Sequence, residues 1–182
     1  VLQVLFNMSD IAVVGQFAGA EALGAVGSTA TLVFLFTGFL IGIGNGINAR
    51  IAMYLGSRSD RDTEETVHTS CILSALIGVL LLIIGVVFAR PLLELLNTKD
   101  VLIDGACLYL RIYFLGMPAL ALYNFGNAVF SAAGNTKKPL VYLLVAGVIN
   151  VLLNLLFVIV CGLGVAGVAI ASAVSQLALI QI

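Results

Sequence analysis

The chain has 182 residues, of which 62% are hydrophobic and only 9% are charged, with a formal net charge of −1. Soluble domains carry about 25% charged residues, so this composition excludes a surface that faces water over most of the chain. The few basic residues are scattered, which excludes the basic face that nucleic acid would require, and we expect no nucleic-acid partner.

Six apolar segments follow one another and predict a bundle of membrane-spanning helices. A helix needs ~20 apolar residues to cross a bilayer, so the chain holds roughly six spans with short connections. Strands are excluded because the segments show no period of two and an open sheet cannot satisfy its backbone in lipid. The predicted fold is therefore all-α, a polytopic bundle of about six transmembrane helices over residues 1–18, 25–55, 67–89, 101–133, 139–160 and 165–182.

The connections between these segments set the orientation in the membrane. They fall near residues 19–24, 56–66, 90–100, 134–138 and 161–164, so the second and fourth lie on one side. That side carries Arg50, Arg58, Arg61, Lys137 and Lys138, whereas the other carries Arg90, Lys99 and Arg111. Because basic residues accumulate on the cytoplasmic side, we expect a multi-pass protein of the cytoplasmic membrane with the first side inside.

Glycine and proline mark two further features of the segments. Gly38, Gly42 and Gly46 form a row of small residues at four-residue spacing. Such a row lets another helix approach closely, or alternatively provides a sliding surface. Pro118 removes a helix hydrogen bond inside the fourth segment and predicts a kink there.

Asp10 is the clearest candidate functional residue, because a carboxylate inside the bilayer is costly to keep charged. It lies eight residues before Ala18, which places it about 12 Å inside the end of the first segment. Its side chain is a candidate proton carrier or cation ligand. The alternative is a carboxylate that lines a wet crevice as a structural hydrogen-bonding group.

Polar side chains in three other segments can supply oxygen ligands near Asp10. Asn150 and Asn154 are spaced i, i+4 in the fifth segment and project from one helical face. Their amides can bind a hard cation or a protonated carboxyl group, or they can simply join helices. Asn127 and Ser172 add oxygen atoms from the fourth and sixth segments.

Several kinds of enzyme site find no support in the sequence. There is no His/Glu metal motif, no Gly-x-Ser-x-Gly and no phosphate-binding loop. The three cysteines are too widely spaced for a disulfide framework or a zinc site, and we interpret them as packing residues. We expect no enzymatic activity, no permanently bound metal and no cofactor.

Five stretches of the chain carry a family resemblance when they are taken together and in order. They are residues 7–17 (NMSDIAVVGQF), 21–27 (EALGAVG), 109–118 (YLRIYFLGMP), 134–139 (GNTKKP) and 164–172 (GVAGVAIAS). Together they resemble the multidrug and toxic compound extrusion family, the MATE transporters, over nearly the whole chain.

The resemblance implies that residues 1–182 are the N-terminal six-helix lobe of a longer protein, cut within helix one, whose second lobe lies outside this sequence. Two such lobes would enclose a cavity and alternate between inward and outward openings. The implied function is export of drug-like or cationic organic compounds, driven by H⁺ or Na⁺. The implied partners are a small organic substrate and membrane lipid, with the protein acting as a monomer.

The same resemblance assigns roles to individual residues. Asp10 would be the coupling carboxylate of helix one, and Asn127, Asn150 and Ser172 would be its polar partners. Asn154 departs from the pattern, because many relatives carry an aspartate there. A transient sodium ion at Asp10 would then be balanced by one carboxylate, so the coupling ion stays open.

Two alternatives differ from cation-coupled export in what they require. A lipid-linked oligosaccharide flippase of the same superfamily would need cationic groups in its cavity for a diphosphate headgroup, and only Arg111 is available. In a non-transporting membrane scaffold, Asp10 and the asparagines would be assembly contacts.

Overall fold

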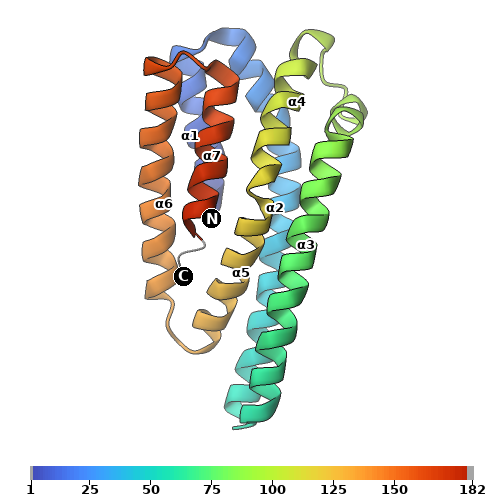
Figure 1. The fold of residues 1–182 in the computed structure, drawn as a ribbon, viewed down its shortest axis with the longest axis vertical. Coiled ribbons are helices and arrows are strands. Elements are labelled where there is room, and N and C mark those ends of the chain that lie inside the picture. The colour runs from blue at the N-terminus through green and yellow to red at the C-terminus, as the bar shows by residue number, and fades with distance from the viewer. Residues whose placement is uncertain (1, 180–182) are drawn as a thin grey trace.

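The computed structural model describes the backbone of residues 2–179 and the side chains of residues 6–179. This part of the chain contains helices and turns and no strand (Figure 1). A π-helical turn, η1, continues α6 directly. The elements are α1 (Leu2–Phe17), α2 (Gly19–Gly56), α3 (Asp60–Leu95), α4 (Asp100–Leu115), α5 (Met117–Ala132), α6 (Lys137–Leu155), η1 (Leu156–Val160) and α7 (Gly164–Ala178).

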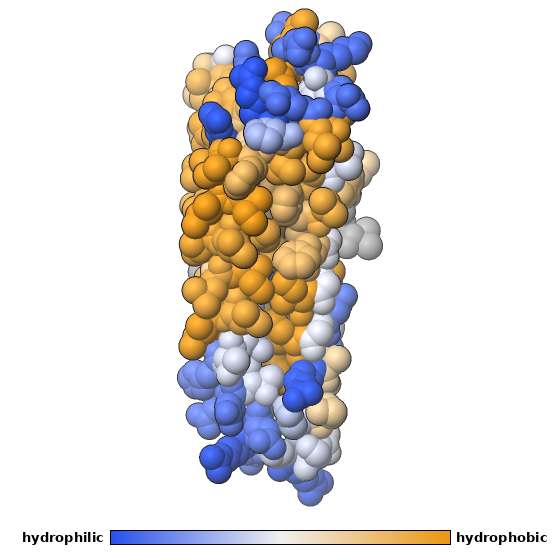
Figure 2. All heavy atoms as spheres, turned by 90° about the vertical axis from the view of Figure 1, so that its right-hand side faces the viewer, coloured by the Kyte–Doolittle hydropathy of each residue, from blue (hydrophilic) through white to orange (hydrophobic). Residues whose placement is uncertain are grey.

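The helices have the lengths and surface expected of a membrane protein. Three of them, α2, α3 and α6 with η1, are long and apolar enough to cross a bilayer, and the bent pair α4 and α5 qualifies as a fourth span. Helix α7 is shorter but apolar, and α1 has 16 residues. Figure 2 shows a broad apolar belt between two hydrophilic ends. The predicted all-helical membrane fold is confirmed, and four of the six expected segments reach span length within the described residues.

Three of the predicted connections are much shorter than expected. The predicted loop at 90–100 is wrong, because α3 continues through Pro91 to Leu95 and α4 begins at Asp100. The predicted loop at 19–24 is wrong, because α2 begins at Gly19 and the chain turns within one residue after α1. Gly19 has a φ of +88°, which a residue with a side chain adopts at a cost. The predicted loop at 56–66 is also wrong, because α3 begins at Asp60. The first turns of α3 are charged and exposed, so the helix extends into water although this part of its sequence is not apolar.

Helices α4 and α5 form one bent unit that packs against α3. They meet at an angle of 47° around Gly116, and Pro118 stands at the start of α5, where its missing N–H costs nothing. A Cβ atom at Gly78 would lie 2.6 Å from the Cα atom of Pro118, and one at Gly85 would overlap the ring of Phe114. Glycine is therefore required where α3 approaches the bend.

The predicted packing row on α2 makes no helix contact among the described residues. Gly38, Gly42 and Gly46 are exposed, and a Cβ atom at each would meet no described atom within 4 Å. Two other glycines of α2 are closely packed. A Cβ atom at Gly24 would lie 3.0 Å from the Cδ1 atom of Leu102 on α4, and one at Gly44 would lie 3.2 Å from the carbonyl oxygen of Asn124 on α5. Contact of the exposed row with a further helix stays a prediction.

Candidate functional site: a buried carboxylate at the junction of four helices

Asp10 lies where α1, α4, α6 and α7 meet, and its side chain is completely buried. Three donors from three different helices point at its carboxylate. The hydroxyl groups of Tyr109 and Ser172 donate to Oδ2 at 2.6 and 2.7 Å. The Nδ2 atom of Asn154 donates to Oδ1 at 2.8 Å. Hydrogen bonds to a carboxylate are stronger than those between neutral groups, so these donors offset much of the cost of burying it.

A second layer of hydrogen bonds holds these donors in place. Asn150 donates to the hydroxyl oxygen of Ser172 at 3.0 Å, and Asn154 donates to the Oδ1 atom of Asn150 at 3.3 Å. Asn7, one turn before Asp10, donates to the hydroxyl oxygen of Tyr109 at 3.3 Å. A change in the charge or the hydrogen bonds of the carboxylate therefore alters contacts on all four helices.

Two oxygen atoms of the site are buried without a donor. They are the Oδ1 atoms of Asn7 and Asn154. Buried acceptors without partners are costly in a protein interior. Asp10 itself makes no ion pair within residues 6–179. The site thus has one negative charge and two free neutral oxygens, which are the ligands that a hard monovalent cation prefers. In this same part of the chain, no cluster of three His, Cys, Asp or Glu side chains could hold a metal ion.

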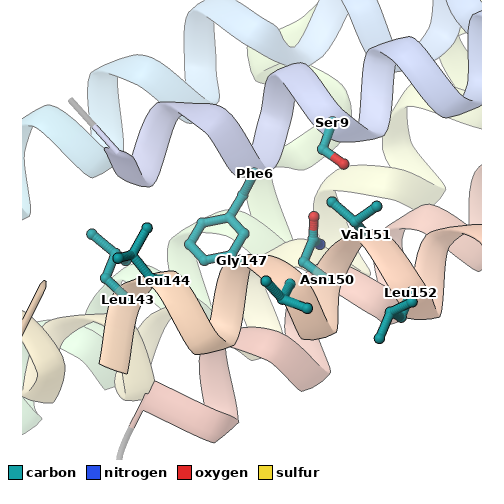
Figure 3. A pocket seen from close by; sticks show the side chains of 9 residues that line it. Phe6, Ser9, Leu143, Leu144, Gly147, Asn150, Val151 and Leu152 are labelled. Carbon is teal, nitrogen blue, oxygen red and sulfur yellow. The ribbon is translucent and has the colours of Figure 1, made fainter. Parts of the chain in front are cut away.

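A largely apolar pocket lies between α1 and α6, directly beside this network (Figure 3). Its volume is about 370 Å³, within the range of ligand pockets in proteins. Phe6, Leu143, Leu144, Gly147 and Val151 are among the residues that form its apolar wall. Its polar lining comes from Ser9 and Asn150, and both belong to the hydrogen-bond network of Asp10.

The structure brings together most of the residues that the sequence singles out. Asp10, Asn150, Asn154 and Ser172 are joined directly by hydrogen bonds. Asn127 is not one of the residues so joined. It is half-buried on α5, beside Ala128, which packs with Ile47 and Ile51 of α2 in a separate apolar cluster.

Sequence reasoning missed three members of the network: Asn7, Ser9 and Tyr109. Asn7 is three residues before Asp10 and therefore on the same helical face, which is a signal that the sequence carries. Tyr109 is typical of an aromatic side chain at a membrane interface, but it is completely buried. Only the packing of α4 against α2 and α7, which both contact α1, shows that its hydroxyl group reaches the carboxylate.

Comparison with known proteins gives a consistent result. The MatE family model matches residues 1–156. The chain is 34% identical to the probable multidrug resistance protein YoeA of Bacillus subtilis (strain 168), over 98% of this chain and 39% of the relative. It is 27% identical to a FAD transporter of Shewanella oneidensis, over 94% of this chain and 39% of that protein.

Solved structures agree with the sequence relatives. A crystal structure of MATE in the bent conformation superimposes with a TM-score of 0.92 at 26% identity, over 98% of this chain and 40% of that one. The straight conformation gives a TM-score of 0.88 at 25% identity, over 98% of this chain and 39% of that one. The chain thus spans about 40% of the length of the proteins that it matches.

Proposed function

Because the chain belongs to the MatE family of membrane transporters, we propose that it forms the N-terminal lobe of a cation-coupled exporter of small organic molecules. The observation that carries the proposal is the continuity between a buried carboxylate and a ligand-sized pocket. Ser9 and Asn150 line the pocket and also belong to the network around Asp10. A cation at Asp10 therefore acts on the wall of the pocket.

The coupling cation would bind at Asp10 and change its hydrogen bonds. A proton on the carboxylate turns one acceptor oxygen into a donor, so the hydroxyl group of Tyr109 or Ser172 that points at it must rotate. A sodium ion would instead draw in the free oxygens of Asn7 and Asn154. Rotation of Ser172 would change the acceptor that Asn150 uses, and movement of Asn154 would change the donor that Asn150 receives. Asn150 forms part of the pocket wall, so either change reaches the pocket.

Transport follows if the cation and the organic substrate favour opposite arrangements of this network. The ion gradient then supplies the difference in affinity, because each ligand shifts the equilibrium only by its differential binding. The apolar wall of the pocket suits the hydrocarbon part of an amphipathic compound. Alternation between inward and outward openings would occur with the second lobe.

A flippase for lipid-linked oligosaccharides is a weaker candidate. A diphosphate headgroup in a membrane cavity requires cationic partners. The lining of the pocket beside Asp10 contains no basic residue, and Arg111 is exposed on α4. A neutral, apolar wall favours an organic compound without a phosphate.

The proposal is tested by transport in everted membrane vesicles that contain the full-length protein. Uptake of a fluorescent organic cation is measured with a proton gradient and then with a sodium gradient, for the parent and for Asp10→Asn. We expect uptake by the parent and loss of gradient-driven uptake in Asp10→Asn at equal protein abundance, since the variant lacks the charge that binds the cation.

Asp100→Asn is the matched control, because Asp100 is exposed at the start of α4. It should transport like the parent under the gradient that is effective. If Asp10→Asn transports as well as Asp100→Asn under both gradients, Asp10 does not couple a cation and the proposal is wrong. If Asp10→Asn only lowers the amount of protein, the scaffold interpretation gains support.

A further inference from the structure

A second group of buried polar side chains lies between α2, α4 and α7. It consists of Thr37, Tyr113 and Gln176, whose exposed fractions are 4%, 2% and 1%. The hydroxyl group of Tyr113 faces the other two side chains. None of the three is needed for the hydrogen bonds of Asp10 described above.

The hydroxyl group of Tyr113 lies close to both Thr37 and Gln176, but it carries one hydrogen atom and cannot satisfy all of their polar atoms. Oγ1 of Thr37 and both Nε2 and Oε1 of Gln176 are buried without a hydrogen bond. The amide of Gln176 is fixed in place, because it lies against the backbone at the α4–α5 break. A Cβ atom at Gly116 would overlap its Oε1 atom. The amide therefore occupies space that only glycine leaves open.

Leaving these atoms unsatisfied would be expensive, since each buried donor or acceptor without a partner costs roughly 1–3 kcal/mol. Buried polar groups in native proteins that lack a protein partner are generally bound to ordered water. Such a water needs two to four polar partners. Oγ1 of Thr37, the hydroxyl group of Tyr113 and the two amide atoms of Gln176 supply four.

We propose that Thr37, Tyr113 and Gln176 form a buried binding site for ordered water at the α4–α5 break. A metal cation is a poor occupant, because all three side chains are neutral and a charge in the bilayer interior needs a counter-charge. Water satisfies the donor of Gln176 as well as the acceptors, which a cation cannot do.

The position of this water site connects it to Asp10. Tyr113 stacks on Tyr109 with ring centroids 5.8 Å apart, and Tyr109 donates to Asp10. Asp10 acts electrostatically on Tyr113, and Tyr113 acts on Tyr109. If Asp10 exchanges a cation as proposed above, the water is a polar neighbour of the hydrogen-bond network of Asp10 at the α4–α5 break. This consequence rests on the proposed function, whereas the water site itself does not.

Hydroxyl-radical footprinting tests the site directly, because radicals generated from a bound water oxidise the side chains beside it. In the full-length protein, labelling of Tyr113 is compared with that of Phe114, the next residue, which is completely buried among apolar groups. We expect Tyr113 to be labelled and Phe114 to remain unlabelled. Labelling of Tyr113 should fall to the level of Phe114 in Gln176→Met, which keeps the volume but removes the amide.

Thr37→Val provides a second variant, with the same shape and no hydroxyl group, and should also lower the labelling of Tyr113. A rise in the labelling of Phe114 identifies a misfolded variant, in which case the other variant decides. Equal, minimal labelling of Tyr113 and Phe114 in the parent overturns the proposal, and so does unchanged labelling of Tyr113 in a folded variant. Labelling does not depend on transport, so an inactive Asp10 would leave this result intact.

Discussion

The two sides of the helix bundle are held together in different ways. On one side, α3 packs against α4 and α5 through glycines, with the ring of Phe114 seated on Gly85 and the start of α5 on Gly78. On the other side, α1, α6 and α7 meet through a network of hydrogen bonds around one carboxylate. Apolar shape complementarity has one good arrangement, whereas hydrogen-bonded hydroxyl and amide groups have several. The first side is suited to stability and the second to a change of state.

Gly85→Ala should have the largest effect on stability. Its added methyl group would overlap the ring of Phe114, which also packs edge-on against Phe36 with ring centroids 5.0 Å apart. Overpacking of this kind costs about 1–3 kcal/mol. We expect a lower melting temperature of the purified protein in detergent.

The double variant Gly85→Ala/Phe114→Leu checks the cause of that loss. The smaller leucine leaves room for the new methyl group, so the double variant should be less destabilised than the sum of the two single variants. A melting temperature for Gly85→Ala equal to that of the parent would show that α3 does not depend on this contact, and the contrast between the two sides would disappear.

Ser172→Ala should affect the polar side, with a smaller loss of stability than Gly85→Ala. The variant removes one donor to Asp10 and one acceptor of Asn150. One hydrogen bond contributes about 1 kcal/mol, so the cation concentration for half-maximal transport should change about fivefold. The measurement is uptake of an organic cation against the concentration of the effective cation.

Ser172→Thr is the matched control, because it retains the hydroxyl group at the same position. Its cation dependence and its melting temperature should stay close to those of the parent. A change in melting temperature without a change in cation dependence would assign Ser172 to stability, contrary to this comparison.

Sequence reasoning succeeded for the residues whose cost of burial is visible in their chemistry. A lone aspartate in an apolar segment and two asparagines at i, i+4 identify themselves, because each would be unfavourable in lipid without a partner. Tyr109 carries no such signal. Its ring suits a membrane interface as well as a core, and only the packing of α4 against α2 and α7 places its hydroxyl group at Asp10 on α1.

The boundaries of the helices were harder to predict than the order of the apolar segments along the chain, and the predicted fourth segment is divided into α4 and α5. Hydropathy locates the lipid-embedded part of a helix, but a helix can continue into water, as α3 does from Asp60 through its charged first turns. The spacing of small residues also failed to identify the glycines that are closely packed. The row of Gly38, Gly42 and Gly46 satisfies the pattern but is exposed among the described residues, whereas Gly78 and Gly85 lie seven residues apart and are buried.

Gly42→Ala should have the smallest effect on stability, and it tests the same contrast from the other direction. A Cβ atom at Gly42 meets no described atom within 4 Å, so the methyl group costs nothing in packing. Alanine also favours the helix over glycine by about 1 kcal/mol. The melting temperature of Gly42→Ala should therefore equal or slightly exceed that of the parent, while that of Gly85→Ala falls.

Transport by the same Gly42→Ala variant separates the two interpretations of the glycine row. If a further helix packs or slides against the row during transport, the methyl group should slow uptake without lowering the melting temperature. If the row faces lipid or water throughout, uptake should match that of the parent. A melting temperature well below that of the parent would instead mean that Gly42 is closely packed, and the row that is exposed among residues 6–179 would then be an interface.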